Sequence, residues 1–137
     1  MKETFVFHKL RVWHLAKELV KDVYMLTKSF PVEERFGLAA QINRAAVSVA
    51  SNIAEGSGRV NRKDQAHFTQ LAYGSLMEVA CQMEIAQELG FLSEDSLKSV
   101  SSSIKTVAEK LSALRSSQLS SLNPHQGVVS VHHEVAK

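Results

Sequence analysis

Histidine, cysteine and glutamate side chains are the residues of this sequence that could bind a metal ion or take part in catalysis. None of the six histidines stands in a His-x-x-x-His or Glu-x-x-His pair, the spacings that place zinc or di-iron ligands on one face of a helix. His132, His133 and Glu134 are adjacent, but a solvated tail is the simpler interpretation there. Cys81 stands in an apolar helical pattern that favours burial over reactivity. The sequence therefore predicts no catalytic site, no metal site and no cofactor.

Lysine and arginine side chains offer a second kind of chemistry, the binding of phosphate groups. The candidates are a cluster at the expected turn between the second and third helices and a series along the first helix: Arg59, Arg62 and Lys63, then Lys9, Lys17 and Lys21. Residues 1–63 hold eleven Lys and Arg against six Asp and Glu, whereas residues 64–137 hold five against eight. The alternative is an ordinary solvated surface, because helices often vary this much in charge. No aromatic residue alternates with these basic residues, so base stacking is not expected.

A row of mostly short polar side chains is the least ordinary pattern in the sequence. It lies on one side of the expected second helix and consists of Gln41, Arg44, Ser48, Asn52 and Glu55. Arg44 and Glu55 are eleven residues apart, which is about three helical turns, so they share a face. We expect a buried polar seam against another helix, with Glu78 as the candidate partner of Arg44, because an unpaired buried charge is very costly. The alternative is a partly wet groove in which water serves these groups.

Four amphipathic segments are expected to position these side chains. Apolar residues recur at helical spacing over residues 5–29, 37–55, 61–90 and 93–119. Pro31, the Gly56-Ser57-Gly58 run, taken as a left-handed helix cap, and Gly90 separate the segments. Because the connections are short, neighbouring helices must run in opposite directions. The sequence thus predicts an all-α, antiparallel up-down-up-down four-helix bundle over residues 1–122. It also predicts a disordered C-terminal tail over residues 123–137, with a short strand there as the alternative.

The apolar surfaces of these helices differ in width. The fourth helix has one narrow stripe, formed by Leu97, Val100, Ile104, Val107, Leu111 and Leu114. The first helix is apolar over about half of its circumference, and the third is apolar almost all round. Three neighbours in a lone bundle cannot easily cover such a third helix, so the pattern predicts self-association. The alternative is a wide core face with some exposed apolar area, which is common on monomers.

Bulk composition fits one helical domain. The chain has 137 residues, of which 45% are hydrophobic and 22% charged, with a formal net charge of +2. It has a single cysteine, no apolar run long enough to span a membrane, and no signal-peptide pattern at its start. These features predict a cytoplasmic location without a membrane partner.

The second-helix segment also carries a resemblance to a known family. Residues 41–59 resemble the signature of the four-helix-bundle proteins encoded by intervening sequences in bacterial 23S ribosomal RNA genes. The run Asn52-Ile-Ala-Glu-Gly56 is its most specific part, and residues 10–13 and 72–78 add further matches. The likeness covers roughly residues 5 to 115. Asn43 departs from the pattern, because many members carry a second arginine there, before Arg44.

The resemblance implies more than the residues do. It implies a bacterial cytoplasmic protein, commonly a ring of five identical subunits. The family is also similar to the accessory protein of diversity-generating retroelements, a basic pentamer that associates with nucleic acid and a reverse transcriptase. We therefore expect a non-catalytic homo-oligomer that acts as an accessory factor associated with RNA or DNA. The alternative is a structural scaffold for another protein, without affinity for nucleic acid.

Overall fold

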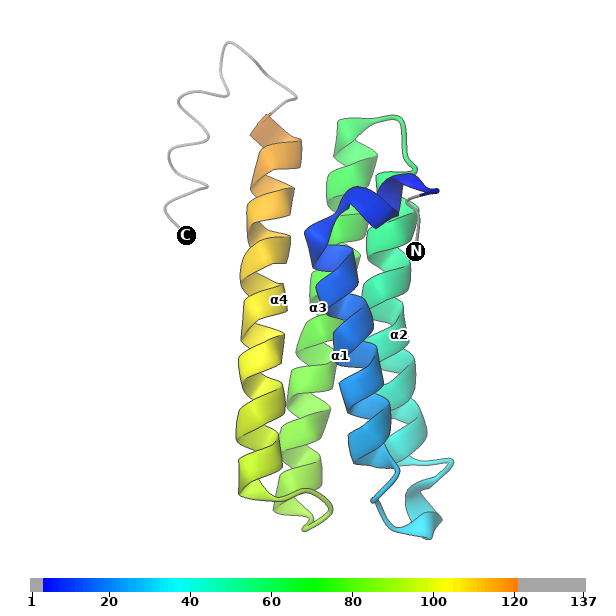
Figure 1. Cartoon of the computed structure of the whole chain (residues 1–137), viewed down its shortest axis with the longest axis vertical. Coiled ribbons are helices and arrows are strands. Elements are labelled where there is room, and N and C mark those ends of the chain that lie inside the picture. Colours follow the sequence, from blue (N-terminus) through cyan, green and yellow to red (C-terminus); the bar gives the residue numbers. More distant parts are fainter. Residues whose placement is uncertain (1–3, 121–137) are drawn as a thin grey trace.

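The computed structural model describes residues 4–120, which form four long helices and two short 3-10 helices. In chain order these are η1 (Val6–Lys9), α1 (Arg11–Thr27), η2 (Val32–Glu34), α2 (Leu38–Ser57), α3 (Arg62–Glu88) and α4 (Glu94–Ser120). The long helices lie side by side, and the chain reverses direction at each short connection (Figure 1). Each long helix packs against the next one in the chain, and α1 also packs against α4. The predicted four-helix bundle is confirmed, whereas the expected tail, residues 123–137, lies outside the described residues.

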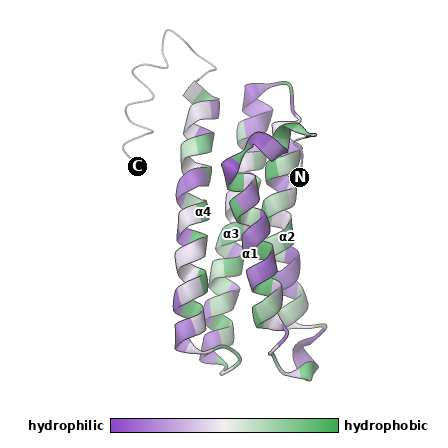
Figure 2. Cartoon of the chain, in the orientation of Figure 1, coloured by the Kyte–Doolittle hydropathy of each residue, from purple (hydrophilic) through white to green (hydrophobic). Residues whose placement is uncertain are grey.

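The core is a single apolar cluster to which all four long helices contribute. Its largest fully buried side chains include Leu19, Ile42, Leu76, Met83 and Leu111. Burying each such side chain contributes roughly 1.5–3 kcal/mol of transfer free energy. The narrow stripe predicted for α4 is confirmed, because Val100, Ile104 and Val107 are buried. In Figure 2 the apolar colours of α4 lie on the edge that faces α3, and polar colours cover the rest of that helix.

The start of the first helix differs from the prediction. Residues 6–9 form a separate 3-10 turn, and Leu10 is extended, with φ −92° and ψ 116°, so α1 begins only at Arg11. The Nδ1 atom of His8 accepts hydrogen bonds from the backbone N–H groups of Thr4 and Phe5, both at 3.1 Å. Side-chain acceptors of this kind compete with helix formation. As a result η1 lies across the end of the bundle and packs on α2.

The glycines at the helix ends have different functions from the one predicted at Gly56–Gly58. Gly56 lies inside α2 and Gly58 has a right-handed conformation, so neither is a left-handed cap. A Cβ atom at Gly56 would lie 2.7 Å from Cβ of Phe68, so this glycine permits α2 and α3 to approach closely. Gly90 does adopt a positive φ, +82°, and the Phe91 N–H group donates to the Ala86 carbonyl at 2.9 Å. That pairing is a Schellman motif, which ends α3.

The two helices with wide apolar surfaces differ in how much of that surface is covered. On α1, the apolar side chains beside the buried stripe include Trp13 and Val20, which are half-buried against the core, and Tyr24, which is exposed. On α3, a series of side chains on the outside of the bundle stays exposed, and we call it the α3 outer face: Leu71, Met77, Cys81, Ile85 and Leu89. Cys81 was expected to be buried and is instead exposed, because α3 carries apolar residues on the side away from the core as well.

Candidate nucleic-acid interface

Charged residues separate along the axis of the bundle. The end formed by η1, the α2–α3 connection and the end of α4 is called the basic end, and it carries Lys9, Arg11, Arg59, Arg62 and Lys63, with Glu55 and Asp64. The opposite end, called the acidic end, is formed by η2 and the α3–α4 connection. It carries Glu33, Glu34, Glu88, Glu94 and Asp95, with Lys28, Arg35 and Lys98. Charges distant in sequence therefore add to one field at each end.

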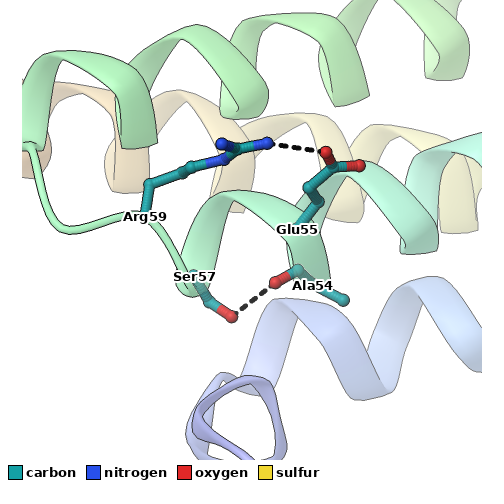
Figure 3. Close-up of polar contacts among 4 residues, drawn as sticks. All are labelled: Ala54, Glu55, Ser57 and Arg59. Carbon is teal, nitrogen blue, oxygen red and sulfur yellow. Dashed lines mark hydrogen bonds and ion pairs between the residues drawn. The ribbon is translucent and has the colours of Figure 1, made fainter.

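Arg59 is held in place by two neighbours at the basic end. Its guanidinium donates to Oε2 of Glu55 at 2.8 Å. The guanidinium carbon, Cζ, lies 4.5 Å from the ring centre of Phe68. Figure 3 shows the Arg59 side chain extended toward Glu55, while the Ser57 hydroxyl turns the other way and donates to the Ala54 carbonyl. Because about half of each charged side chain is exposed, the pair is worth at most about 1 kcal/mol. A phosphate could therefore compete with Glu55 for this guanidinium.

Arg62 and Lys63 begin α3 but contact different groups. The Arg62 guanidinium donates to Oε1 of Gln65 at 3.1 Å and to the Ser117 carbonyl at 3.2 Å. It thus joins the start of α3 to the end of α4. The side chain of Asn61 caps the helix by accepting from the backbone N–H group of Lys63 at 2.7 Å. Lys63 itself is exposed, so of these two residues Lys63 is the more accessible to a phosphate.

The three lysines predicted on the first helix do not form one patch with these residues. Lys9 lies at the basic end, but α1 runs away from it, so Lys17 and Lys21 lie about 9 and 15 Å beyond Arg11 at 1.5 Å per residue. Lys21 pairs with Glu18 at 3.7 Å. Lys17 lies over the ring of Trp13, with Nζ 5.1 Å from the ring centre. The structure therefore groups Lys9 with Arg59, Arg62 and Lys63, and leaves Lys17 and Lys21 outside that group.

Aromatic side chains lie beside the basic residues, contrary to the expectation from the sequence. The aromatic cluster at the start of the chain consists of Phe5, Phe7, His8, Trp13 and His14. The sequence reasoning looked for alternation between adjacent residues. The contacts instead arise at i,i+4 spacing, as for Lys17 on Trp13, and across a connection, as for Arg59 on Phe68. The i,i+4 spacing of Trp13 and Lys17 was visible in the sequence, whereas the contact between Arg59 and Phe68 was not.

A groove between α3 and α4 adds a basic residue that the sequence reasoning missed. Its lining runs from Tyr73 and Lys105, which lie farthest from the basic end, to residues nearer that end, including Arg115. The Nε atom of Arg115 is buried and has no hydrogen-bond partner among residues 4–120. Nothing in the sequence distinguished Arg115, because the helical pattern alone does not show which side of α4 borders a groove.

The row of polar residues on α2 divides into two parts. Gln41 and Ser48 contact side chains of α3, and Asn52 donates to Ser48 within α2. The Ser48 and Ser75 hydroxyls are 2.8 Å apart, Asn52 Nδ2 donates to Ser48 Oγ at 3.0 Å, and Gln82 Nε2 donates to Gln41 Oε1 at 3.4 Å. The short side chains of Ser48 and Ser75 allow α2 and α3 to lie close together at this point. This half of the row is a polar seam within the chain.

The charged members of the row turn outward instead. Arg44 and Glu55 are exposed, and Glu55 pairs with Arg59. Within residues 4–120 no ion pair joins Arg44 to Glu78, whose carboxylate accepts from Gln82 at 3.4 Å. The predicted Arg44–Glu78 pair is therefore not formed within the described part of the single chain, where Arg44 is exposed and Glu78 contacts Gln82 instead. Burial of Arg44 and Glu55 by a second copy stays a prediction.

Two further kinds of site, a cluster of metal ligands and a membrane-spanning helix, are absent from the part of the chain that the structure describes. Residues 4–120 contain no group of three or more His, Cys, Asp or Glu side chains that could hold a metal ion. None of the helices in this range has the length and apolar character needed to cross a membrane.

The architecture and the comparisons with known proteins define the class of protein. The structure is a four-helix bundle with a polar seam between α2 and α3. Residues 8–113, most of the chain, match the 23S rRNA-intervening sequence protein family, and the chain belongs to that family. The predicted family is thereby confirmed.

A solved structure gives independent support for the fold. It is a protein of unknown function from the S23 ribosomal protein family of Bacteroides thetaiotaomicron. The two chains share 18% identity, and the alignment covers 76% of this chain and 97% of that chain with a TM-score of 0.71. Such a likeness shows the fold alone. No curated protein matches the sequence.

Proposed function

We propose that this protein is a non-catalytic homo-oligomer, with five subunits, that associates with RNA or DNA as an accessory factor. The observation that supports the proposal most directly is the collection of Lys9, Arg11, Arg59 and Lys63 at one end of the bundle. In a cyclic ring whose axis runs along the bundles, every basic end lies on the same rim. A polyanion could then contact several subunits at once, which raises its effective affinity without any new contact.

The α3 outer face supports the self-association part of the proposal. Leu71, Ile85 and Leu89 are 42%, 44% and 58% exposed, so the apolar series continues along much of the helix. Gly74 lies among them with nothing within 4 Å of where a Cβ would be, which leaves room for a neighbouring helix to approach. Beside this face, Arg44 and Glu55 offer charges that a second copy could pair. A subunit number of five comes from the family resemblance.

Salt-dependent binding tests the nucleic-acid part. We expect the wild-type protein to bind a fluorescein-labelled RNA of 40 nucleotides, with an affinity that falls steeply between 50 and 200 mM salt as counterions are released. The double variant Lys9→Glu/Lys63→Glu should bind at least about tenfold more weakly at 50 mM salt. The matched control, Lys28→Glu/Lys98→Glu at the acidic end, should bind like the wild type. Absence of salt-sensitive binding by the wild type at low ionic strength would reject the proposal.

Light scattering tests the assembly. The expected particle has five times the chain mass of 15.1 kDa. A stable single copy at micromolar concentration would contradict self-association and with it the shared rim. A cytoplasmic location is part of the same proposal, because Cys81 is an exposed free thiol, a form that reducing compartments maintain. Recovery of the protein outside the cytoplasmic fraction of its native cells would contradict that location.

A structural scaffold for another protein is the second candidate function. The exposed apolar α3 outer face favours it, because such surfaces commonly mark sites of protein contact. This candidate predicts an oligomer without affinity for nucleic acid. It also predicts that a protein partner is recovered with the wild type from native cells after nuclease treatment, and is not recovered with an Ile85→Glu variant.

A further inference from the structure

The aromatic cluster at the start of the chain leaves the ring of Phe5 largely exposed to solvent. The Phe5 and Phe7 rings are stacked, with centres 5.7 Å apart and planes at 15°. Phe7 lies in turn against Trp13 and His8, with both ring centres at 4.6 Å. Phe7 and Trp13 are half-buried, whereas Phe5 is 60% exposed. Phe5 is therefore the outermost ring of a pile that is anchored in the bundle.

Hydrogen bonds to the backbone fix this pile before any ligand arrives. The ring of His8 is buried and accepts from the N–H groups of Thr4 and Phe5, which sets the position of the Phe5 backbone. The Nε2 atom of His14 donates to the His8 carbonyl at 2.7 Å and so ties η1 to the first turn of α1. A ring held in this way loses little conformational entropy when a ligand stacks on it.

The charge around the pile suits a polyanion. Lys9 and Arg11 flank it in the sequence, and Lys17 lies over Trp13 at its base. The acidic end offers a natural comparison, because Phe36 is 90% exposed there and lies 6.0 Å from the Arg35 guanidinium. Glu33 and Glu34 precede that pair, and the Phe36 ring has no stacked aromatic neighbour among the described residues. A flat, supported ring in basic surroundings occurs only at the basic end of the described chain.

We propose that the Phe5–Phe7 pile is a stacking platform for unpaired bases, so that the nucleic acid recognised by the basic end is single-stranded. This inference rests on the proposed nucleic-acid association and specifies its class of ligand. An unpaired base can continue the stack on Phe5, while Lys9 and Arg11 contact the adjoining phosphates. In a duplex the base faces are covered by their neighbours, so a duplex meets only the charges. The expected preference is for single-stranded over duplex nucleic acid and not for a particular base sequence, since every base has a face that can stack.

Trp13 provides a direct reporter, because it is the only tryptophan of the chain and contacts the pile. The experiment titrates the protein with a 20-nucleotide oligothymidine and with the matching dT·dA duplex, and follows Trp13 fluorescence together with anisotropy. We expect the single strand to quench Trp13 and to bind more tightly than the duplex. Phe5→Ala should weaken binding of the single strand about tenfold and reduce the quenching, and should change duplex binding by less than about twofold.

Two further variants separate stacking from a change in fold. Phe5→Tyr keeps a ring that can stack and should bind like the wild type, whereas Phe36→Ala removes a still more exposed ring at the acidic end and should have no effect. Equal losses of single-strand and duplex binding in Phe5→Ala, or no loss, would overturn the platform while leaving the proposed function intact. Failure of the wild type to bind either form would overturn both. Binding of anionic lipid vesicles that requires Phe5, without preference for single strands, would assign the pile to a membrane surface and also overturn the platform.

Discussion

The two ends of the bundle contain similar side chains in different arrangements. Each has an exposed phenylalanine, and each has an arginine near an aromatic ring, at 4.5 Å for Arg59 and Phe68 and at 6.0 Å for Arg35 and Phe36. At the basic end the surrounding charges are mostly positive and the rings support one another. At the acidic end two carboxylates, Glu33 and Glu34, precede Phe36 in the sequence, and among the described residues the Phe36 ring contacts no other ring. The comparison indicates that recognition depends on which residues the bundle brings to one end, more than on any single residue type.

The largest expected effect is on self-association, which decides how many basic ends can bind one nucleic-acid molecule together. Ile85→Glu places a charge on the α3 outer face, where a second copy would have to bury it. We expect self-association to weaken at least about hundredfold, without loss of helical content, because Ile85 is outside the core of the single chain. Light scattering and circular dichroism measure these two quantities.

The same variant sharpens the comparison between the ends. A long RNA should bind the dissociated Ile85→Glu protein much more weakly than the wild-type ring, because avidity is lost, whereas a short oligonucleotide should bind both nearly alike. Met25→Glu is the matched control, since Met25 is 65% exposed on α1. If Met25→Glu dissociates the assembly and Ile85→Glu does not, the contact between copies lies on α1 instead.

The second prediction compares the glycines at the two ends. Gly56→Ala should destabilise the protein by about 2–3 kcal/mol, because the added Cβ would lie 2.7 Å from Cβ of Phe68 and force α2 and α3 apart. Gly90→Ala has open space around it and should cost only about 1–2 kcal/mol, the strain of a positive φ. Urea unfolding at one fixed protein concentration measures both. Equal losses would mean that α3 can shift to accommodate a methyl group at the basic end.

Local patterns in the sequence were sufficient for the number and order of the long helices and for the core. The three-four spacing of Val100, Ile104 and Val107 predicts the buried side of α4, because a helix repeats every 3.6 residues. The exposed α3 outer face also followed from periodicity, since a helix that is apolar nearly all round must leave part of that surface uncovered in a single bundle.

Contacts between distant segments were the part that periodicity could not supply. Gly56 was interpreted as a helix cap, and its close approach to Phe68 depends on the packing angle of two helices. The break at Leu10 depends on a side-chain acceptor, His8, which competes with the helix it would otherwise join. Arg44 and Glu55 share a face as predicted, but which way that face points depends on where α3 lies.

The smallest predicted effect concerns the carboxylate of Glu55, which pairs with Arg59 at the basic end. Glu55→Ala removes the partner of Arg59 from an exposed pair, so the single chain should lose less than about 1 kcal/mol of stability. The released guanidinium and the lost negative charge should raise affinity for a single-stranded oligonucleotide about two- to threefold at 50 mM salt.

Glu33→Ala serves as the control at the acidic end, where removal of a carboxylate should leave affinity nearly unchanged. The Glu55→Ala measurement also bears on assembly, because Glu55 lies beside the α3 outer face. If a second copy pairs with Glu55, the loss in the free energy of self-association should be far larger than the loss in the folding stability of the single chain. A neutral result for both stability and assembly would leave Glu55 as a local counterion of Arg59, and would remove it from any contact between copies.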